Sequence, residues 1–118
     1  MSEDKKVKDL EYDDDSTDLS LSGYFFDAND LKVLKAVLPE RRKNLALLDF
    51  GIDHQLTNED ISPLMGAIEF LKEKLPKLNT VILFNYRLSE WAVHCELKQR
   101  PNLSDITFKV SLYDINKR

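Results

Sequence analysis

Four short apolar segments recur along the chain with one shared spacing of hydrophobic positions. Three of them place apolar residues at the first, fourth and sixth positions: Leu45, Leu48 and Phe50; Leu78, Val81 and Leu83; Leu103, Ile106 and Phe108. The second set follows the first after 33 residues, and the third follows after a further 25. Leu19 and Leu21 match the last two positions of an earlier copy, 29 residues before Leu48 and Phe50. Alternating apolar and polar residues over such short segments predict four β-strands.

The stretches between these segments have helical periodicity. A first helix, capped by Asp27 or Asn29 and stopped by Pro39, is predicted from one apolar face made of Leu31, Leu34, Val37 and Leu38. A second carries a stripe of Ile61, Leu64, Ile68 and Leu71. It starts either at a capping box formed by Thr57 and Asp60, or at Ser62 with Pro63 in its first turn. A third, shorter helix is predicted after Ser89, through Trp91 and Cys95.

Strand alternating with helix at a period of 25 to 33 residues predicts an α/β fold of repeated units. Proline introduces two of the strands, in Leu75-Pro76-Lys77-Leu78 and in Arg100-Pro101-Asn102-Leu103, where it ends the preceding helix. Such a period is typical of a short right-handed solenoid with a parallel sheet on one side.

The recurring L-x-x-L-x-L segments resemble the leucine-rich repeats, particularly the longer class that is similar to ribonuclease inhibitor. The best match is residues 45–71, LALLDFGIDHQLTNEDISPLMGAIEFL, and the resemblance covers roughly residues 16–112. It implies about four repeats, with the sheet on the concave side and the helices on the convex side. The family usually has Asn three positions after the last strand Leu, where it bonds neighbouring backbones. Here those positions hold Tyr24, Asp53, Tyr86 and Ser111, and Asp53 alone is a fair substitute.

The ends of so short a solenoid need covering. We assign residues 1–15 to an acidic and polar N-terminal segment, flexible or capping, and residues 16–118 to the repeat domain. We expect one end to be covered by Val7, Leu10 and Tyr12, and the other by Val110, Leu112, Tyr113 and Ile115.

The resemblance also implies a binding surface, because this family uses the outward strand positions of the concave sheet to bind partners. Carried onto this chain, these positions are Asp18, Ser20, Ser22, Leu47, Asp49, Gly51, Thr80, Ile82, Phe84, Asp105, Thr107 and Lys109. The expected partner-binding residues among them are Leu47, Asp49, Thr80, Ile82, Phe84, Thr107 and Lys109. Leu47, Ile82 and Phe84 would form an exposed apolar group, which usually marks an interaction site. The alternative is that a terminal segment covers this face, or that both sheet faces are buried.

Composition narrows the possible functions. The 118 residues are 42% hydrophobic and 32% charged, with a formal net charge of −4, so we expect one soluble domain that does not bind nucleic acid. One Cys and two His suit a reducing compartment, and we expect a cytoplasmic protein that neither spans nor binds a membrane. The partner is expected to be a protein or peptide. The oligomeric state has no signal in the sequence.

Catalysis is not expected. His94 and Cys95 are adjacent on a predicted helix and point about 100° apart, so the imidazole cannot readily deprotonate the thiol. Asp49, Asp53 and His54 lack the spacing of a metal or acid–base site, and turn formation explains the aspartates better. We expect no catalytic residues, no metal and no cofactor. Trp91 is expected in the core, and Arg41-Arg42-Lys43 to be a solvated helix end. The alternative function is a compact α/β regulatory domain similar to the STAS family, controlled by Ser/Thr phosphorylation within residues 57–62.

Overall fold

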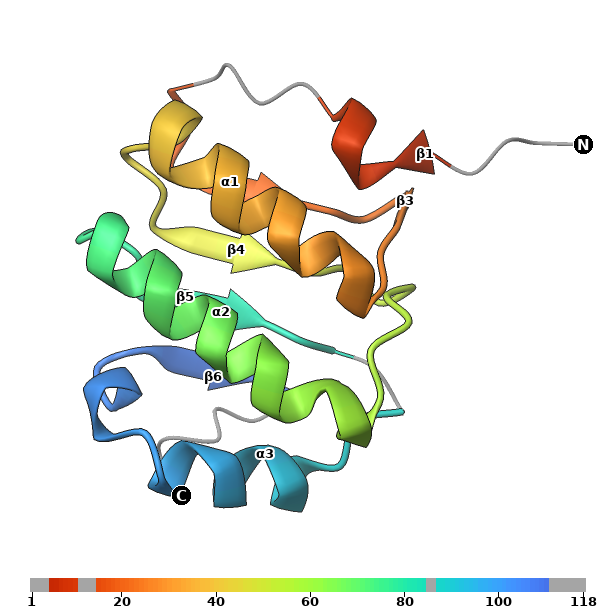
Figure 1. The fold of residues 1–118 in the computed structure, drawn as a ribbon, viewed down its shortest axis with the longest axis vertical. Coiled ribbons are helices and arrows are strands. Elements are labelled where there is room, and N and C mark those ends of the chain that lie inside the picture. Colours follow the sequence, from red (N-terminus) through yellow and green to blue (C-terminus); the bar gives the residue numbers. More distant parts are fainter. Residues whose placement is uncertain (1–4, 11–14, 85–86, 111–118) are drawn as a thin grey trace, which may run out of the picture.

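Four strands form a parallel sheet in the order in which they occur along the chain. The computed structural model describes residues 5–10, 15–84 and 87–110. The sheet order is β2-β4-β5-β6 (Figure 1), with bounds β2 Asp18–Ser20, β4 Leu47–Asp49, β5 Thr80–Ile82 and β6 Thr107–Lys109. All three pairings are parallel, so the protein has an α/β fold with a four-stranded parallel sheet.

Helices connect these strands and lie along one face of the sheet (Figure 1). The α-helices are α1 Leu31–Arg41, α2 Ile61–Lys74 and α3 Glu90–Lys98. Short 3-10 helices span Val7–Asp9 (η1), Ala28–Asp30 (η2), Asn58–Asp60 (η3) and Pro101–Leu103 (η4). Helix α1 packs against α2, and α2 packs against α3.

The predicted helix starts are confirmed, with one of the two alternatives for the second helix excluded because Ser62 lies inside α2. The Asp27 carboxylate accepts from the Asn29 N–H at 3.0 Å, and a capping box joins Asp27 to Asp30 before α1. The Thr57 N–H donates to the Asp60 carboxylate at 2.9 Å in the corresponding capping box before α2. Ser89 caps α3 by accepting from the Ala92 N–H at 3.2 Å. Caps are local in sequence, which is why spacing alone identified them.

The predicted end of the first helix is wrong. Pro39 lies inside α1, which continues to Arg41. Proline lacks an N–H and disrupts a helix interior, but near the last turn little helix remains for it to break. The Arg42 N–H still bonds the Leu38 carbonyl at 2.9 Å and closes the helix end.

The strand register shows which residues lie side by side across the sheet. Leu19 pairs with Leu48, Leu48 with Val81, and Val81 with Phe108, and all four side chains are buried. The prediction that Ile106 occupies the fourth of these positions is wrong, because Ile106 precedes β6 and the offset from Val81 is two residues longer. Ile106 is buried too, so the apolar pattern did not distinguish the two registers.

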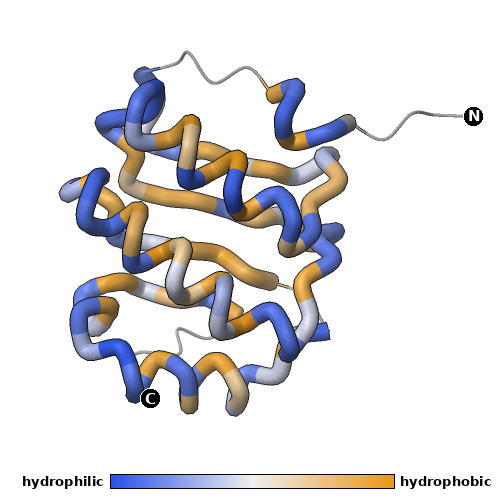
Figure 2. Tube along the Cα trace, viewed as in Figure 1, coloured by the Kyte–Doolittle hydropathy of each residue, from blue (hydrophilic) through white to orange (hydrophobic). Residues whose placement is uncertain are grey.

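The core lies between the sheet and the helices. The residues directly after the four strands are buried as well, namely Leu21, Phe50, Leu83 and Val110. Along β4 and β5 the chain is mainly apolar, whereas polar and apolar residues alternate along the helices (Figure 2). Helix α2 contributes most to the core, with buried residues Ile61, Leu64, Met65, Ala67, Ile68 and Leu71.

The first end of the sheet is covered by the N-terminal segment. Strand β1 (Lys5–Lys6) pairs in parallel with β3 (Tyr24–Phe25), so residues distant in sequence lie side by side (Figure 1). Val7 is fully buried, and Leu10 packs against the core as expected. Tyr12, Leu112, Tyr113 and Ile115, also named as capping residues, lie outside the described residues, as do Tyr86 and Ser111.

Candidate binding surface

The face of the sheet that points away from the helices is formed by alternate strand residues. We call it the open face, and it consists of Asp18, Ser20, Leu47, Asp49, Thr80, Ile82, Thr107 and Lys109. None of these residues is buried, whereas their strand neighbours Leu19, Leu48, Val81 and Phe108 are. The alternative that both sheet faces are buried is therefore wrong for these strands.

The open face is arranged in two rows that run across the strands. The first row, set by the register, is Asp18, Leu47, Thr80 and Thr107. The second is Ser20, Asp49, Ile82 and Lys109. Leu47 and Ile82 are half-buried, so each keeps part of its apolar surface in contact with water. Six of the seven expected partner-binding residues thus lie on one surface.

The seventh expected residue, Phe84, lies two residues beyond Ile82, just past the end of β5, and is half-buried. The predicted frame placed Lys109 beside Phe84. The structure places Lys109 beside Ile82 instead, because β6 pairs two residues out of the predicted register. For the same reason Asp105 precedes β6 and is not a strand position.

The carboxylate of Asp49 holds the end of β4 as well as facing the open side. One oxygen accepts from the Gly51 N–H at 2.9 Å, and the other accepts from the Ser20 hydroxyl at 3.5 Å. Gly51 has a φ of +84° and is packed so closely that an added Cβ would lie 3.0 Å from the Ser22 Cα. Gly51 is accordingly buried, and Ser22 beside it is exposed, so the predicted outward position at Gly51 presents no side chain.

His54 is a structural residue whose role the sequence did not indicate. Its side chain is fully buried. The Nδ1 atom accepts from the Leu56 N–H at 3.1 Å, so Nε2 is left to donate to the Leu83 carbonyl at 3.4 Å. These bonds tie the loop after β4 to the next strand, a role that the resemblance assigned to Asp53. Burial lowers the pKa of His54, which keeps the imidazole neutral.

Asp49, Asp53 and His54 do not form a chemical cluster. Asp53 is exposed, while His54 points into the core. In residues 5–10, 15–84 and 87–110, no group of three His, Cys, Asp or Glu side chains is arranged to hold a metal ion. The carboxylate of Asp49 is bonded to its own turn, in the way expected of a turn-forming aspartate.

Two predictions outside the sheet are wrong. Trp91, expected in the core, is 69% exposed on α3, where Lys98 lies 5.9 Å from its ring. The indole lies on the side of α3 opposite the buried Val93, and the helical pattern alone did not show which stripe faces inward. Arg42, expected to be solvated, is buried and donates to the Asp18 carbonyl at 2.8 Å.

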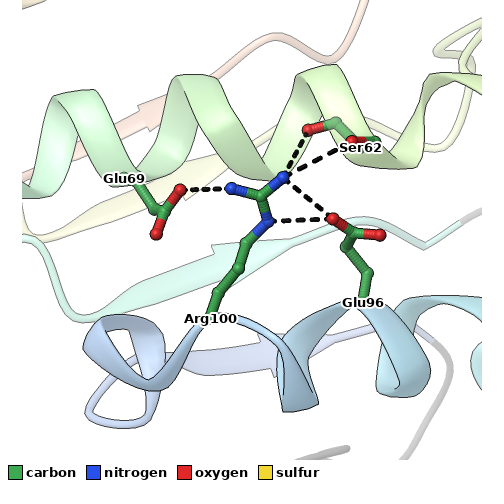
Figure 3. A network of polar contacts seen from close by, with 4 residues as sticks. All are labelled: Ser62, Glu69, Glu96 and Arg100. Carbon is green, nitrogen blue, oxygen red and sulfur yellow. Dashed lines mark hydrogen bonds and ion pairs between the residues drawn. The ribbon is translucent and has the colours of Figure 1, made fainter.

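Arg100 joins the last two helices in a polar network that the sequence did not signal. Its guanidinium forms ion pairs with Glu96 of α3, at 2.9 Å, and with Glu69 of α2. It also lies 3.4 Å from the carbonyl and hydroxyl oxygens of Ser62 (Figure 3). The network lies on the helical side and leaves the open face untouched.

An open cavity of about 390 Å³ lies among the loops that follow the first two strands, lined by Gly23, Tyr24, Phe25, Asp53 and Gln55. Asp53 is its single ionisable carboxylate, and His54 does not line it. A nucleophile paired with a base, the usual requirement for covalent catalysis, is not present among these five residues.

None of the helices in the described part of the chain is long and apolar enough to cross a membrane. No family model, curated protein or solved structure matches this chain.

Proposed function

We propose that this protein is a short leucine-rich-repeat solenoid that binds a protein or peptide on its concave sheet face and performs no catalysis. The open face is that surface, and Leu47, Asp49, Thr80, Ile82, Phe84, Thr107 and Lys109 are the residues proposed to contact the partner. The proposal includes a cytoplasmic location, no cofactor, and no nucleic-acid or membrane partner.

The order of the strands supports the repeat architecture. Each β–α unit lies beside the next unit in the chain, and equivalent strand residues pair in one register across the sheet. This is the arrangement that stacked repeats require. A compact regulatory domain similar to the STAS family would favour a shuffled strand order, so the observed order gives that alternative no support.

The observation that carries the proposal is the one-sided sheet. Helices cover one face, and the opposite face keeps the half-buried aliphatic side chains of Leu47 and Ile82 in contact with water. Burying such side chains against a partner contributes about 25 cal/mol for each Å² of apolar surface removed from water, before the costs of association are subtracted. A sheet held by a packed core also presents these groups on a backbone that is already ordered, which lowers the entropic cost of binding.

The test is affinity capture from the source cells with three forms of the protein, followed by quantitative mass spectrometry. Ile82→Asp places a charge at the centre of the open face. Trp91→Asp is the matched control, because Trp91 is an exposed apolar residue on the helical side. A partner of the sheet is expected to be lost with Ile82→Asp and retained with Trp91→Asp, and its binding must then be reproduced with purified components.

The opposite result, loss with Trp91→Asp and retention with Ile82→Asp, would place the binding surface on the helices and remove the proposal. Phe84→Asp extends the test to the edge of the surface. Circular dichroism of each variant establishes that loss of binding does not come from unfolding.

A further inference from the structure

The second row of the open face carries opposite charges on either side of an aliphatic residue. Asp49, Ile82 and Lys109 lie side by side on β4, β5 and β6, in one register. Neighbouring strands are about 4.8 Å apart, so the backbones at Asp49 and Lys109, two strands apart, are separated by about 10 Å. The row therefore has a definite order of acid, aliphatic residue and base.

Residues next to this row add further charged and apolar side chains to it. Asp18, on the neighbouring strand β2 and diagonal to Asp49, is exposed and adds a second carboxylate at the acidic end. Two further apolar side chains lie next to this row: Leu47, on β4 and diagonal to Ile82, and Phe84, two residues after Ile82. Lys109 is exposed, and in the described part of the chain no ion pair is recorded for its ammonium group.

The charges of the open face are available to a partner. Arg42 bonds the backbone carbonyl of Asp18 and not its carboxylate. The Asp49 carboxylate accepts from an N–H and a hydroxyl, neither of which carries a charge. A complementary partner would accordingly present a cation to the Asp18 and Asp49 side, an apolar group to Ile82, and a carboxylate to Lys109.

The spacing distinguishes a helix from an extended segment. Along an α-helix, residues i and i+7 are about 10.5 Å apart, and i+3 and i+4 lie between them on the same face. In an extended strand, side chains on one face recur about every 6.7 Å, which matches neither the 5 Å nor the 10 Å step of this row.

We propose, on the basis of the function inferred above, that the partner segment is an amphipathic helix lying across the strands. It carries residues of opposite charge seven positions apart, with apolar residues at the third and fourth positions between them. The cationic end lies over Asp49 and Asp18, the apolar residues lie over Ile82, and the anionic end lies over Lys109.

The experiment uses two synthetic 15-residue peptides rich in alanine and glutamine. Both have leucine at the seventh and eighth positions. The mixed peptide has glutamate at the fourth position and lysine at the eleventh, whereas the control peptide has lysine at both. Each is titrated into the isotope-labelled full chain, and amide chemical shifts report both the dissociation constant and the location of binding.

The wild-type protein is expected to bind the mixed peptide about three to ten times more tightly than the two-lysine peptide, the range for one exposed ion pair replaced by repulsion. Lys109→Glu is expected to reverse this preference, because both ends of the row are then acidic. The preference disappears in about 1 M salt, where charges on the surface are screened within about 3 Å.

The outcomes separate this inference from the proposed function. If both peptides bind, lose binding with Ile82→Asp, and show no reversal with Lys109→Glu, the charge order is refuted while the open face remains the binding surface. If Ile82→Asp and Thr80→Asp leave binding unchanged and the shifted amides lie on the helices, the proposed function fails too. If neither peptide binds at about 1 mM, the proposal of a helical partner is refuted. Trp91→Ala is the control, and both constants are expected to stay unchanged.

Discussion

Substitutions at two adjacent residues of β5 test directly whether the sheet has one buried face and one open face. Val81 is fully buried and Ile82 is half-buried, so the same substitution at each position has different consequences. Val81→Asp removes about 1.5 to 3 kcal/mol of apolar burial. It also places a carboxyl group in the core, which raises its pKa by several units and costs about 4 kcal/mol or more.

The expected loss at Val81 is therefore about 5 kcal/mol or more. The free energy of unfolding of a 118-residue domain is about 6 to 18 kcal/mol, so Val81→Asp removes a large part of it or unfolds the chain. Ile82→Asp keeps its carboxylate in water and loses only partial burial, at about 1 kcal/mol. Urea denaturation followed by far-ultraviolet circular dichroism measures both.

If Val81→Asp does not fold, alanine variants still allow the losses of stability at Val81 and Ile82 to be compared. Val81→Ala is expected to lower the free energy of unfolding by about 2 kcal/mol, and Ile82→Ala by about 1 kcal/mol or less. Equal losses at the two positions, in both the aspartate and the alanine pairs, would show that Ile82 is as buried as Val81. The open face would then not exist as a surface.

Three further predictions concern residues away from the open face. Burial lowers the folded-state pKa of His54 below its ordinary 6.5, so the unfolded chain takes up a proton first as the pH falls. Stability should therefore decrease by up to about 1.4 kcal/mol per pH unit below about pH 6.5; His54→Gln should remove this decrease and His94→Gln should retain it. Gly51→Ala should cost more free energy of unfolding than Gly23→Ala, at least about 1 kcal/mol more in urea titrations, because both have a positive φ but only Gly51 lacks space for a Cβ; equal costs would contradict the close packing of Gly51. Iodide should quench the fluorescence of Trp91 in the native protein, and the emission maximum should change little on unfolding. A strong shift of the emission maximum would show that the indole is covered.

Local features of the fold were predictable because their physical causes are local. The capping boxes at Thr57 and Asp60, and at Asp27, depend on residues three positions apart, and they start the helices where expected. The alternation of Leu19 and Leu21, or of Leu48 and Phe50, identified the inward side of each strand. The outward side followed from the same alternation, so most of the candidate surface could be identified as well.

The sequence by itself determined the three α-helices, the four strands of the main sheet and the apolar side of each of these strands, since caps and periodicity act between near neighbours in the chain. It did not indicate the short strands β1 and β3, which pair between distant segments. Only the tertiary structure decided the register of the last strand, because Ile106 and Phe108 are both apolar and both buried. It also decided the surroundings of single residues. His54 and Arg42 are buried, and Trp91 is exposed, because burial depends on what packs against a side chain from distant parts of the chain. The charge order of Asp49, Ile82 and Lys109 arises in the same way, from three segments that become neighbours only when the sheet forms.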